Sequence, residues 1–524
     1  MKLEGRQRWI PGVRLAAARV AARWWALPAL LGLGIYLGLL FRTAYVYPRS
    51  SDTAWAPLLG QDLLSGNWKL SGWTLTAYPA WTTEAPAYAL AIAVGGPGAW
   101  LMYVPPALFY AAAAGLAAWL ATLGRGWRAA LPTTLLLGLP TPYLAYLGTQ
   151  PGAHMPTAAF SLAALLAFAA GLRGRWWAAA AGAVLVALAV VGDGLAVAAL
   201  AAPLAGVAIL AAILVRRPGF IGTAVGATVG TVTGLLVRTP TARPGGFSYI
   251  AFTVKLVGPH HWLRNLGLTW TIIVSYLGGD HPWGALAAYP AALLVGAACV
   301  AGFGVAAIRL ASWRNDPFGA WLDAALLAGV AGSFGSFVLT DRPQDIWSGR
   351  YLLPAVCYVA ILAGRHLYSL PGRLRYLALV AVVLLTVVRG GAFLATAAAR
   401  PAVPDHAQLE AWLQDRGLSR GYGPYWDASV VTVETGGRVE VRNVEGAGGR
   451  LRPHAYLSSS RWYRPDPHRA ARFVVFPAAG DDFGVDQAAA VATFGPASEV
   501  DTVGPYVVMV WDHDLAPQLS RAGA

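Results

Sequence analysis

Cysteine and charged residues are both scarce in this chain, and their scarcity excludes several classes of protein. The 524 residues include two cysteines, Cys299 and Cys357, and both lie within apolar runs. We therefore expect neither a disulfide framework nor a zinc site, which requires several Cys or His side chains at short spacings. The sequence contains no Walker loop, no G-x-S-x-G segment and no H-E-x-x-H pair. ATPase, serine hydrolase and zinc protease functions consequently have no support.

Charged residues make up 12% of the chain and hydrophobic residues 57%, and the mean hydropathy is +0.52. This composition lies far from that of an ordinary soluble domain. The net charge of +14 comes from 39 Lys and Arg against 25 Asp and Glu. Much of the basic excess lies in short loops between apolar runs, where it orients helices against the cytoplasmic leaflet. The sequence predicts a multi-pass protein of the bacterial plasma membrane with no nucleic-acid partner.

Apolar runs and the residues that break them predict a polytopic α-helical membrane protein with about eleven transmembrane helices. Segment 85–98 is short and broken by Pro and Gly, so it is either re-entrant or the start of the second span. Segment 260–283 is expected to lie at the outer surface or to be half inserted, since a crossing there would reverse all later loops. The predicted spans lie near 26–44, 99–123, 129–147, 156–172, 176–191, 195–215, 219–237, 284–308, 318–340, 351–368 and 374–395.

The positions of the basic loops orient these spans. With 1–25 as a basic cytoplasmic N-terminus, every predicted inside loop carries Arg, as the positive-inside rule requires. An odd number of spans then places the C-terminal segment outside the membrane. The predicted parts are a transmembrane domain at 26–397, outer loops at 45–98, 238–283 and 341–350, and an extracytoplasmic domain at 398–524.

After Arg400 the composition changes abruptly, and we predict a small C-terminal α/β domain with a mixed sheet. Residues Asp405–Arg416 are predicted to form a helix, because Leu409, Trp412 and Leu413 share one face. Two aromatic segments, 422–427 and 458–463, are suited either to stacking on sugars or to core packing. The predicted strands are Ser429–Glu434, Val439–Val444, Phe473–Phe476 and Tyr506–Trp511.

In the membrane half, many of the few carboxylates fall at the outer ends of the spans. Asp52 follows the first span and precedes a run in which Trp55, Leu58, Leu59 and Leu63 share one helix face. This pattern predicts an amphipathic helix that lies in the membrane interface and ends at Gly66. Asp52 is either the N-cap of that helix or a functional carboxylate, and the spacing does not decide between them.

Other outer residues with candidate roles are both acidic and basic. Glu84, Asp62 and Asp280 are secondary acidic candidates, although Glu84 heads an apolar segment that it could simply cap. Asp193 lies in a Gly-Asp-Gly turn, where a turn role is at least as well supported as catalysis. Arg342 and Arg350, the latter followed by Tyr351, suit phosphate binding at the interface. Snorkelling of an arginine toward lipid headgroups explains the same positions equally well.

These residues resemble the GT-C class of integral-membrane glycosyltransferases, which includes protein O-mannosyltransferases and the lipid A aminoarabinose transferase. The likeness lies in Asp52 after the first span, in Leu-Leu-Ser-Gly-Asn-Trp at 63–68 and in Arg-Tyr-Leu-Leu-Pro at 350–354. The segments 62–75 and 82–84 are also similar to a set of actinobacterial membrane proteins. Many GT-C relatives carry paired acids in the first loop, whereas Asp52 is followed by Thr53. The use of a divalent metal therefore stays open, and we expect no other cofactor.

The resemblance implies transfer of a sugar from a polyprenyl-phosphate donor to an envelope glycan, lipid or protein at the outer face. It makes Asp52 the candidate general base, and Arg350, Arg342 and Tyr351 the candidate site for the donor phosphate. Direct displacement would invert the anomeric centre. Two alternatives are a lipid or solute transporter or flippase, and a non-catalytic envelope assembly protein. Acids at the outer ends, nearly charge-free span centres and the lack of repeated halves favour surface chemistry over transport.

Overall fold

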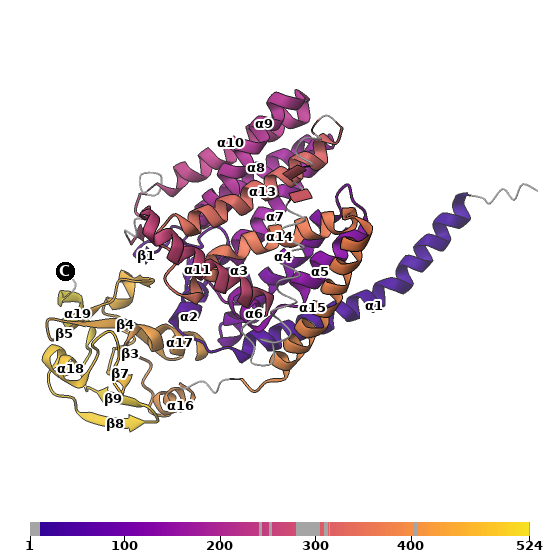
Figure 1. The fold of residues 1–524 in the computed structure, drawn as a ribbon. Coiled ribbons are helices and arrows are strands. Elements are labelled where there is room, and N and C mark those ends of the chain that lie inside the picture. Colours follow the sequence, from indigo (N-terminus) through magenta and orange to yellow (C-terminus); the bar gives the residue numbers. More distant parts are fainter. Residues whose placement is uncertain are drawn as a thin grey trace, which may run out of the picture.

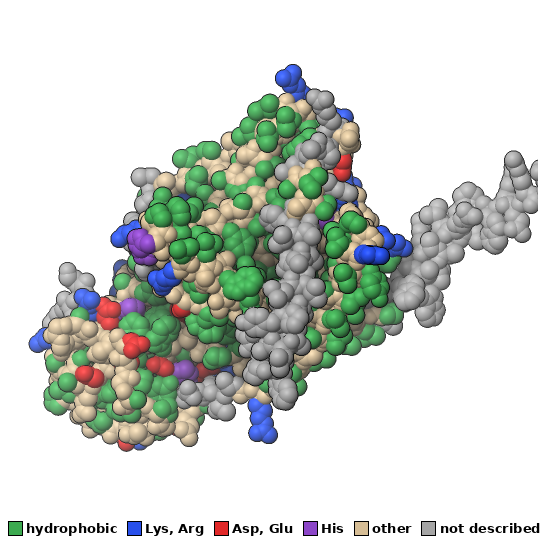
Figure 2. All heavy atoms as spheres, viewed as in Figure 1, with side chains coloured by type: hydrophobic (Ala, Val, Ile, Leu, Met, Phe, Trp, Pro, Cys, Tyr) green, Lys and Arg blue, Asp and Glu red, His purple; other side chains and the backbone are tan. Residues whose placement is uncertain are grey.

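A computed structural model describes residues 11–239, 244–250, 254–278, 304–305, 307–308, 313, 315–401 and 406–522. Helices form the larger part of the molecule, and a smaller α/β domain packs against one end of it (Figure 1). Hydrophobic side chains cover much of the helical part, whereas acidic side chains gather on the α/β domain (Figure 2). The predicted class, a polytopic helical membrane protein with a C-terminal α/β domain, is confirmed.

Within the described residues, seven helices are long and apolar enough to cross a membrane, or eight if a bent pair counts as one span. The bent pair consists of residues 30–46 of α1 and helix α2, which turns away by 118°. The helices of this domain are α1 (Pro11–Val46), α2 (Ser51–Leu64), α3 (Glu84–Gly95), α4 (Val104–Thr122), α5 (Ala130–Gly138), α6 (Pro142–Gly148), α7 (Met155–Leu172), α8 (Trp176–Gly192), α9 (Ala202–Val215), α10 (Pro218–Arg238), α11 (Pro259–Leu277), α13 (Pro317–Val338), α14 (Leu353–His366) and α15 (Gly372–Ala398), with short turns η1 (Ala99–Met102), η3 (Val197–Ala201) and η6 (Ile346–Leu352).

The predicted count of eleven spans is not confirmed. The apolar run at 129–147 splits into the short helices α5 and α6, because Pro140 and Pro142 cannot donate the backbone bonds that a continuous helix needs. Helix α8 has 17 residues and falls just short of a spanning length. Most of the predicted span 284–308 lies outside the described residues.

The C-terminal domain is built on a six-stranded mixed sheet with the strand order β5-β4-β3-β7-β9-β8. Its strands are β3 (Arg420–Gly423), β4 (Glu440–Ala447), β5 (Arg450–Pro453), β7 (Phe473–Pro477), β8 (Glu499–Val503) and β9 (Tyr506–Val510), and its helices are α16 (Ala407–Asp415), α17 (Tyr425–Glu434), α18 (Gln487–Phe494) and α19 (Ala516–Ala522). Helix α16 and strands β4, β7 and β9 confirm four of the predicted elements within a few residues.

The predicted strand Ser429–Glu434 is wrong, because these residues belong to helix α17. Strands β3 and β4 pair in parallel, and parallel neighbours need a crossover, which is usually a helix on one face of the sheet. The β-branched run fits a crossover helix because residues 429–433 are all buried. Thr432 ties this helix to the sheet, since its Oγ1 donates to the Val441 carbonyl oxygen at 2.9 Å.

A second, three-stranded sheet ties the C-terminal domain to the membrane domain. Strand β1 (Trp73–Leu75) comes from the first long loop, and it pairs in parallel with β2 (Ser248–Tyr249) from the loop after α10. On its other side, β1 pairs antiparallel with β6 (Ser458–Ser459) of the C-terminal domain. Backbone pairing therefore fixes this domain against the loops that connect the membrane helices.

Helix α2 also packs inside the protein. The predicted apolar face of Trp55, Leu58, Leu59 and Leu63 is buried in the structure, in a core that includes residues of α3 and α17. Protein therefore covers this face instead of lipid, and the placement of α2 at the membrane interface stays a prediction. The predicted end of the helix is close, since α2 ends at Leu64, and Gly66 follows with a positive φ of 88°.

A buried ion cluster joins α13 and α14 at the ends of these helices that lie far from η6. Arg365 Nε donates to Asp323 Oδ1 at 2.6 Å, and His366 Nε2 lies 2.9 Å from Asp323 Oδ2. Arg365 also donates to the carbonyl oxygen of Leu123 at 2.6 Å, just after α4. Charges with no exposed surface are stable only when they are paired, so this cluster holds three helices together.

We predict that Asp323→Ala lowers the free energy of unfolding by about 3–5 kcal/mol, because it leaves the buried Arg365 without its counter-ion. Thermal unfolding of the purified protein in detergent would measure the change. The double variant Asp323→Ala/Arg365→Met removes both charges and should regain part of the loss. An Asp323→Ala protein as stable as the wild type would contradict the prediction.

Candidate active-site cavity

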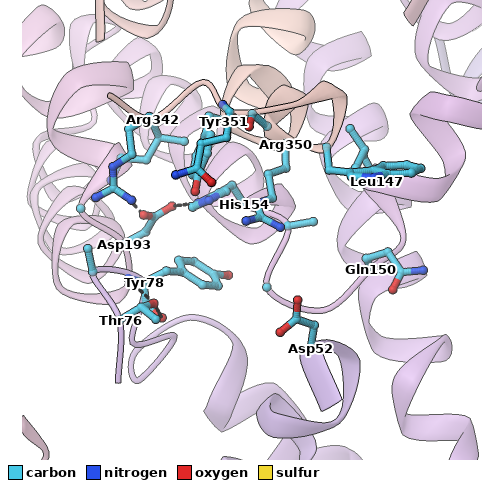
Figure 3. Close-up of a pocket in the computed structure, with 18 of the residues that line it drawn as sticks. Asp52, Thr76, Tyr78, Leu147, Gln150, His154, Asp193, Arg342, Arg350 and Tyr351 are labelled. Carbon is cyan, nitrogen blue, oxygen red and sulfur yellow. Dashed lines mark hydrogen bonds and ion pairs between the residues drawn. The ribbon is translucent and has the colours of Figure 1, made fainter. Parts of the chain in front are cut away.

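A cavity of about 910 Å³ lies where the membrane helices meet the C-terminal domain. Its walls come from distant parts of the chain: the start of α2, the loop after β1, the loop before α7, the turn after α8, the end of α13 with η6, and the C-terminal domain. The polar and aromatic side chains that line it include Asp52, Tyr78, Tyr146, Gln150, His154, Asp193, Arg342, Trp347, Arg350, Tyr351, Trp426 and Tyr456. Figure 3 shows Asp52 at one end of this group and Asp193 at the other, with Arg350 and His154 between them.

The start of α2 places Asp52 in the cavity wall. Ser50 is the N-cap and the helix begins at Ser51, so Asp52 lies in the first turn and is not the cap. Thr53 closes this turn, since its hydroxyl accepts from the Ser50 amide at 3.2 Å and donates to the Ser50 carbonyl at 2.7 Å. The unpaired amides at a helix N-terminus favour a nearby carboxylate. The cap alternative is thereby excluded, whereas the role of Asp52 as a base stays a prediction.

The C-terminal domain contacts this helix start directly. The Tyr425 hydroxyl donates to Asp52 Oδ1 at 2.5 Å, and the Ser429 amide donates to Ser51 Oγ at 3.0 Å. Both donors come from α17, whose residues Ser429–Glu434 the sequence pattern predicted as a strand. The domain that closes the cavity therefore also holds the candidate base.

A cluster of charged side chains lies near this contact, where the two domains meet. Arg49 Nη1 lies 3.2 Å from Glu434 Oε1. His406 Nε2 is 3.0 Å from Asp427 Oδ1, and its Nδ1 is 3.6 Å from Glu434 Oε2. Burial would lower the pKa of His406, but the two carboxylates outweigh it and raise this pKa to about 9. His406 is therefore a cation at neutral pH.

The candidate phosphate-binding residues meet at the segment before α14. Asp345 caps η6, because its Oδ1 accepts from the Ser348 amide at 3.1 Å. The guanidinium carbons of Arg350 and Arg342 lie 5.4 and 5.8 Å from the centre of the Tyr351 ring. The three predicted residues therefore come together, and all three line the cavity with Asp52. Their role toward a phosphate stays a prediction.

The secondary acidic candidates lie elsewhere. Glu84 is buried behind the cavity wall, where it accepts from the Tyr78 hydroxyl at 2.9 Å and from the Gly152 amide at 3.2 Å. Burial raises the pKa of Glu84 to about 7, against the opposing effect of these hydrogen bonds. Asp62 accepts from Trp73 Nε1 at 2.7 Å and does not line the cavity. Asp280 lies outside the described residues.

Sequence reasoning missed several cavity residues. His154 had no motif around it, and Asp193 was judged at least as well explained by a turn, yet the two side chains are 2.7 Å apart in the structure. In the aromatic segments, Tyr422, Trp462 and Tyr463 are core residues, whereas Trp426 is 44% exposed and lines the cavity. The available signals were a lone His before an apolar helix and the Tyr-Trp pair in the segment 422–427.

The described residues also bear on the question of a metal. Among them, no group of three or more His, Cys, Asp and Glu side chains comes together in a way that could hold a metal ion. Asp52 and Asp193, the acids of the two ends of the cavity, are each engaged by a neighbouring side chain instead. We therefore derive no step that uses a metal.

No protein-family model matches the chain, and no curated protein matches its sequence. Solved structures match its fold. ArnT from Cupriavidus metallidurans in the apo state is 14% identical, with a TM-score of 0.60, over 96% of this chain and 99% of that one. ArnT bound to undecaprenyl phosphate is 12% identical, with a TM-score of 0.58, over 92% and 97% of the two chains.

The oligosaccharyltransferase of Archaeoglobus fulgidus in complex with Zn and sulfate is 11% identical, with a TM-score of 0.50. That match covers 84% of this chain and 67% of the archaeal one. These neighbours are glycosyltransferases of the GT-C class. At such low identities the likeness concerns the fold, and this chain shares it almost from end to end.

The charge cluster predicts how the C-terminal domain responds to pH. The raised pKa of His406 gives stability that is complete below its ordinary value of 6.5 and is lost as pH rises through about 9. Burial, followed by the charge of Glu434, raises the pKa of Glu410 to about 8, so ionising Glu410 in this range destabilises the fold as well. We predict that the melting temperature falls between pH 6.5 and pH 9.

Intrinsic fluorescence during heating, together with limited proteolysis between the two domains, would follow this loss. The variant His406→Asn removes the titrating imidazole and should flatten the pH dependence of the melting temperature. A wild-type profile that rises across this range, or an identical slope in the variant, would count against the cluster as its cause.

Proposed function

We propose that the chain transfers a sugar from a polyprenyl-phosphate-linked donor to an envelope acceptor at the outer face of the plasma membrane. The observation that carries this proposal is the placement of Asp52 and Arg350 in one cavity, at the end of a membrane domain with the fold of ArnT. The ArnT structure bound to undecaprenyl phosphate supports a lipid phosphate as the donor carrier. The acceptor is a hydroxyl-bearing glycan, lipid or protein of the envelope.

The residues of the cavity match the needs of this reaction. Asp52 would take the proton from the acceptor hydroxyl as its oxygen bonds to the anomeric carbon of the sugar. The bond between that carbon and the phosphate oxygen would break, and the electron pair would stay on the phosphate. Arg350 and Arg342 would stabilise the added negative charge. Displacement in one step inverts the anomeric centre, as in inverting glycosidases.

The same proposal fixes the orientation in the membrane. The N-terminus and the basic loops would face the cytoplasm, and the C-terminal domain would lie outside. The donor phosphate would then enter at headgroup level beside η6, where Trp347 is 48% exposed and suits a membrane interface. The lipid tail would stay among the membrane helices while the acceptor arrived from the side of the C-terminal domain.

Two acids of helix α2 offer a matched test. Asp52→Asn keeps the shape of the side chain but removes the base, so we expect transfer to fall by roughly 100-fold or more. Asp62→Asn changes a carboxylate on the same helix that does not line the cavity, and transfer should be retained. Mass spectrometry of envelope glycans and polyprenyl-phosphate sugars would compare both variants, a deletion strain and the wild type at equal protein levels.

A glycan that is lost in the deletion strain and in Asp52→Asn, with accumulated donor lipid, would support the proposal. Normal glycans in Asp52→Asn cells would remove the assigned base. If the deletion strain itself kept every glycan and donor lipid at wild-type levels, the transferase function would be abandoned.

Tyr425 provides a second test of the site. Its hydroxyl fixes one oxygen of Asp52 and leaves the other oxygen for the acceptor proton. We predict that Tyr425→Phe lowers kcat about tenfold, because one hydrogen bond to a charged group contributes about 1.5–3 kcal/mol. The control Ser429→Ala keeps the backbone donor of α17 to Ser51. A faster Tyr425→Phe enzyme would mean that the phenol blocks Asp52 instead of positioning it.

A further inference from the structure

The ring of Tyr351 is the centre of a second polar group in the cavity. The His154 ring lies against it with 5.0 Å between ring centres. Arg350 and Arg342 approach the same ring at 5.4 and 5.8 Å. Three side chains that can carry positive charge therefore surround one aromatic ring, and Figure 3 shows them together on one side of the cavity.

A buried carboxylate holds the imidazole of His154. Its Nδ1 is 2.7 Å from Asp193 Oδ2, and the Thr157 hydroxyl donates to the same oxygen. The Leu195 amide donates to the other oxygen, Oδ1, at 2.8 Å. Burial raises the pKa of Asp193, but His154 and these hydrogen bonds outweigh it and lower the pKa below its usual range. Asp193 is therefore a charged partner for the imidazole.

The backbone of His154 is held in an unusual conformation. Its φ of +65° and ψ of 7° lie in the left-handed region, which is unfavourable for a residue with a Cβ. Residues held in such conformations cluster at binding and catalytic sites, where the surrounding structure maintains them. Here the ring is clamped between Tyr78, at 4.8 Å between ring centres, and Tyr351.

Nε2 is the ring nitrogen of His154 that remains for a ligand. With Nδ1 turned to Asp193, Nε2 lies on the opposite edge of the ring, and His154 lines the cavity. Within the described part of the chain, no hydrogen-bond partner faces Nε2. A carboxylate on Nδ1 orients the imidazole and fixes which ring nitrogen is left to face a ligand.

We propose that His154, positioned by Asp193, is a third ligand of the donor phosphate beside Arg350 and Arg342. The inference rests on the proposed function and deepens it. The phosphodiester of the donor carries one negative charge and gains a second when its bond to the sugar breaks. The acceptor proton goes to Asp52, so the new charge stays on the phosphate oxygens. With a proton on each ring nitrogen, His154 donates to Asp193 from Nδ1 and to these oxygens from Nε2. The second hydrogen bond is stronger in the transition state than in the ground state.

The alternative is a purely structural role, in which His154 only holds the start of α7 against Asp193. Two substitutions separate the alternatives, because the amide of Asn reaches the place of Nδ1 and the longer Gln reaches that of Nε2. His154→Asn therefore keeps a donor to Asp193 and removes the donor to the cavity. His154→Gln does the reverse. The matched control is Ser161→Ala, one helical turn after Thr157, where the hydroxyl contacts the Thr157 carbonyl and does not line the cavity.

The experiment measures binding of undecaprenyl phosphate to the full-length protein in detergent or nanodiscs. Wild-type protein and Ser161→Ala should bind alike, whereas His154→Asn and Asp193→Asn should raise the dissociation constant roughly tenfold or more. His154→Gln should lie between them. Competition with inorganic phosphate tests whether the headgroup alone is recognised, and weak competition by it at millimolar concentration would mean that the lipid is needed for full affinity.

Each outcome has a separate meaning. If Arg350→Ala weakens binding and His154→Asn does not, the role of His154 is overturned while the proposed donor survives. If His154→Gln binds as poorly as His154→Asn, and both melt well below the wild type, His154 is structural and the inference fails. If the wild type does not bind undecaprenyl phosphate at all, the proposed donor is overturned and this inference with it.

Discussion

The hydrogen bond between Tyr425 and Asp52 joins residues that are 373 positions apart, and the cavity depends on that contact. One wall belongs to the membrane domain and another to the C-terminal domain, so neither part encloses the space alone. The Ser429–Ser51 bond and the Arg49–Glu434 pair act on the same junction. Displacing α17 by a few ångströms would open the cavity and release the Asp52 side chain together. The contacts that close the site are thus the same contacts that orient the Asp52 carboxylate.

Much of this arrangement could be predicted because a membrane imposes simple rules on a sequence. Chain segments that follow alternate spans emerge on one face, so acids and arginines at those ends are brought near one another. That reasoning places Asp52, Arg342, Arg350 and Tyr351 in one region, and all four line the cavity. It kept Asp62 as a secondary candidate, because only the folded loop shows that Asp62 turns toward Trp73.

Other features depend on tertiary contacts that leave no local pattern. The run Ser429–Glu434 has the composition of a strand, but the parallel pairing of β3 with β4 demands a helix there. His154 and Asp193 lie on either side of two helices, and their pairing becomes visible only when α7 and α8 pack together. The count of eleven spans is not confirmed among the described residues, in part because prolines divide apolar runs that hydropathy alone treats as continuous.

The junction of the two domains has a consequence for biosynthesis. At about 5–20 residues per second, the 373 residues between Asp52 and Tyr425 take roughly 20–75 s to translate. Over a similar interval, strand β1 lacks its partner β6, which comes from the C-terminal domain. A nascent or truncated chain would therefore present a first loop in which β1 pairs with β2 but has one unpaired edge, which quality-control factors can recognise. Translation of the C-terminal domain is therefore a condition for a finished site.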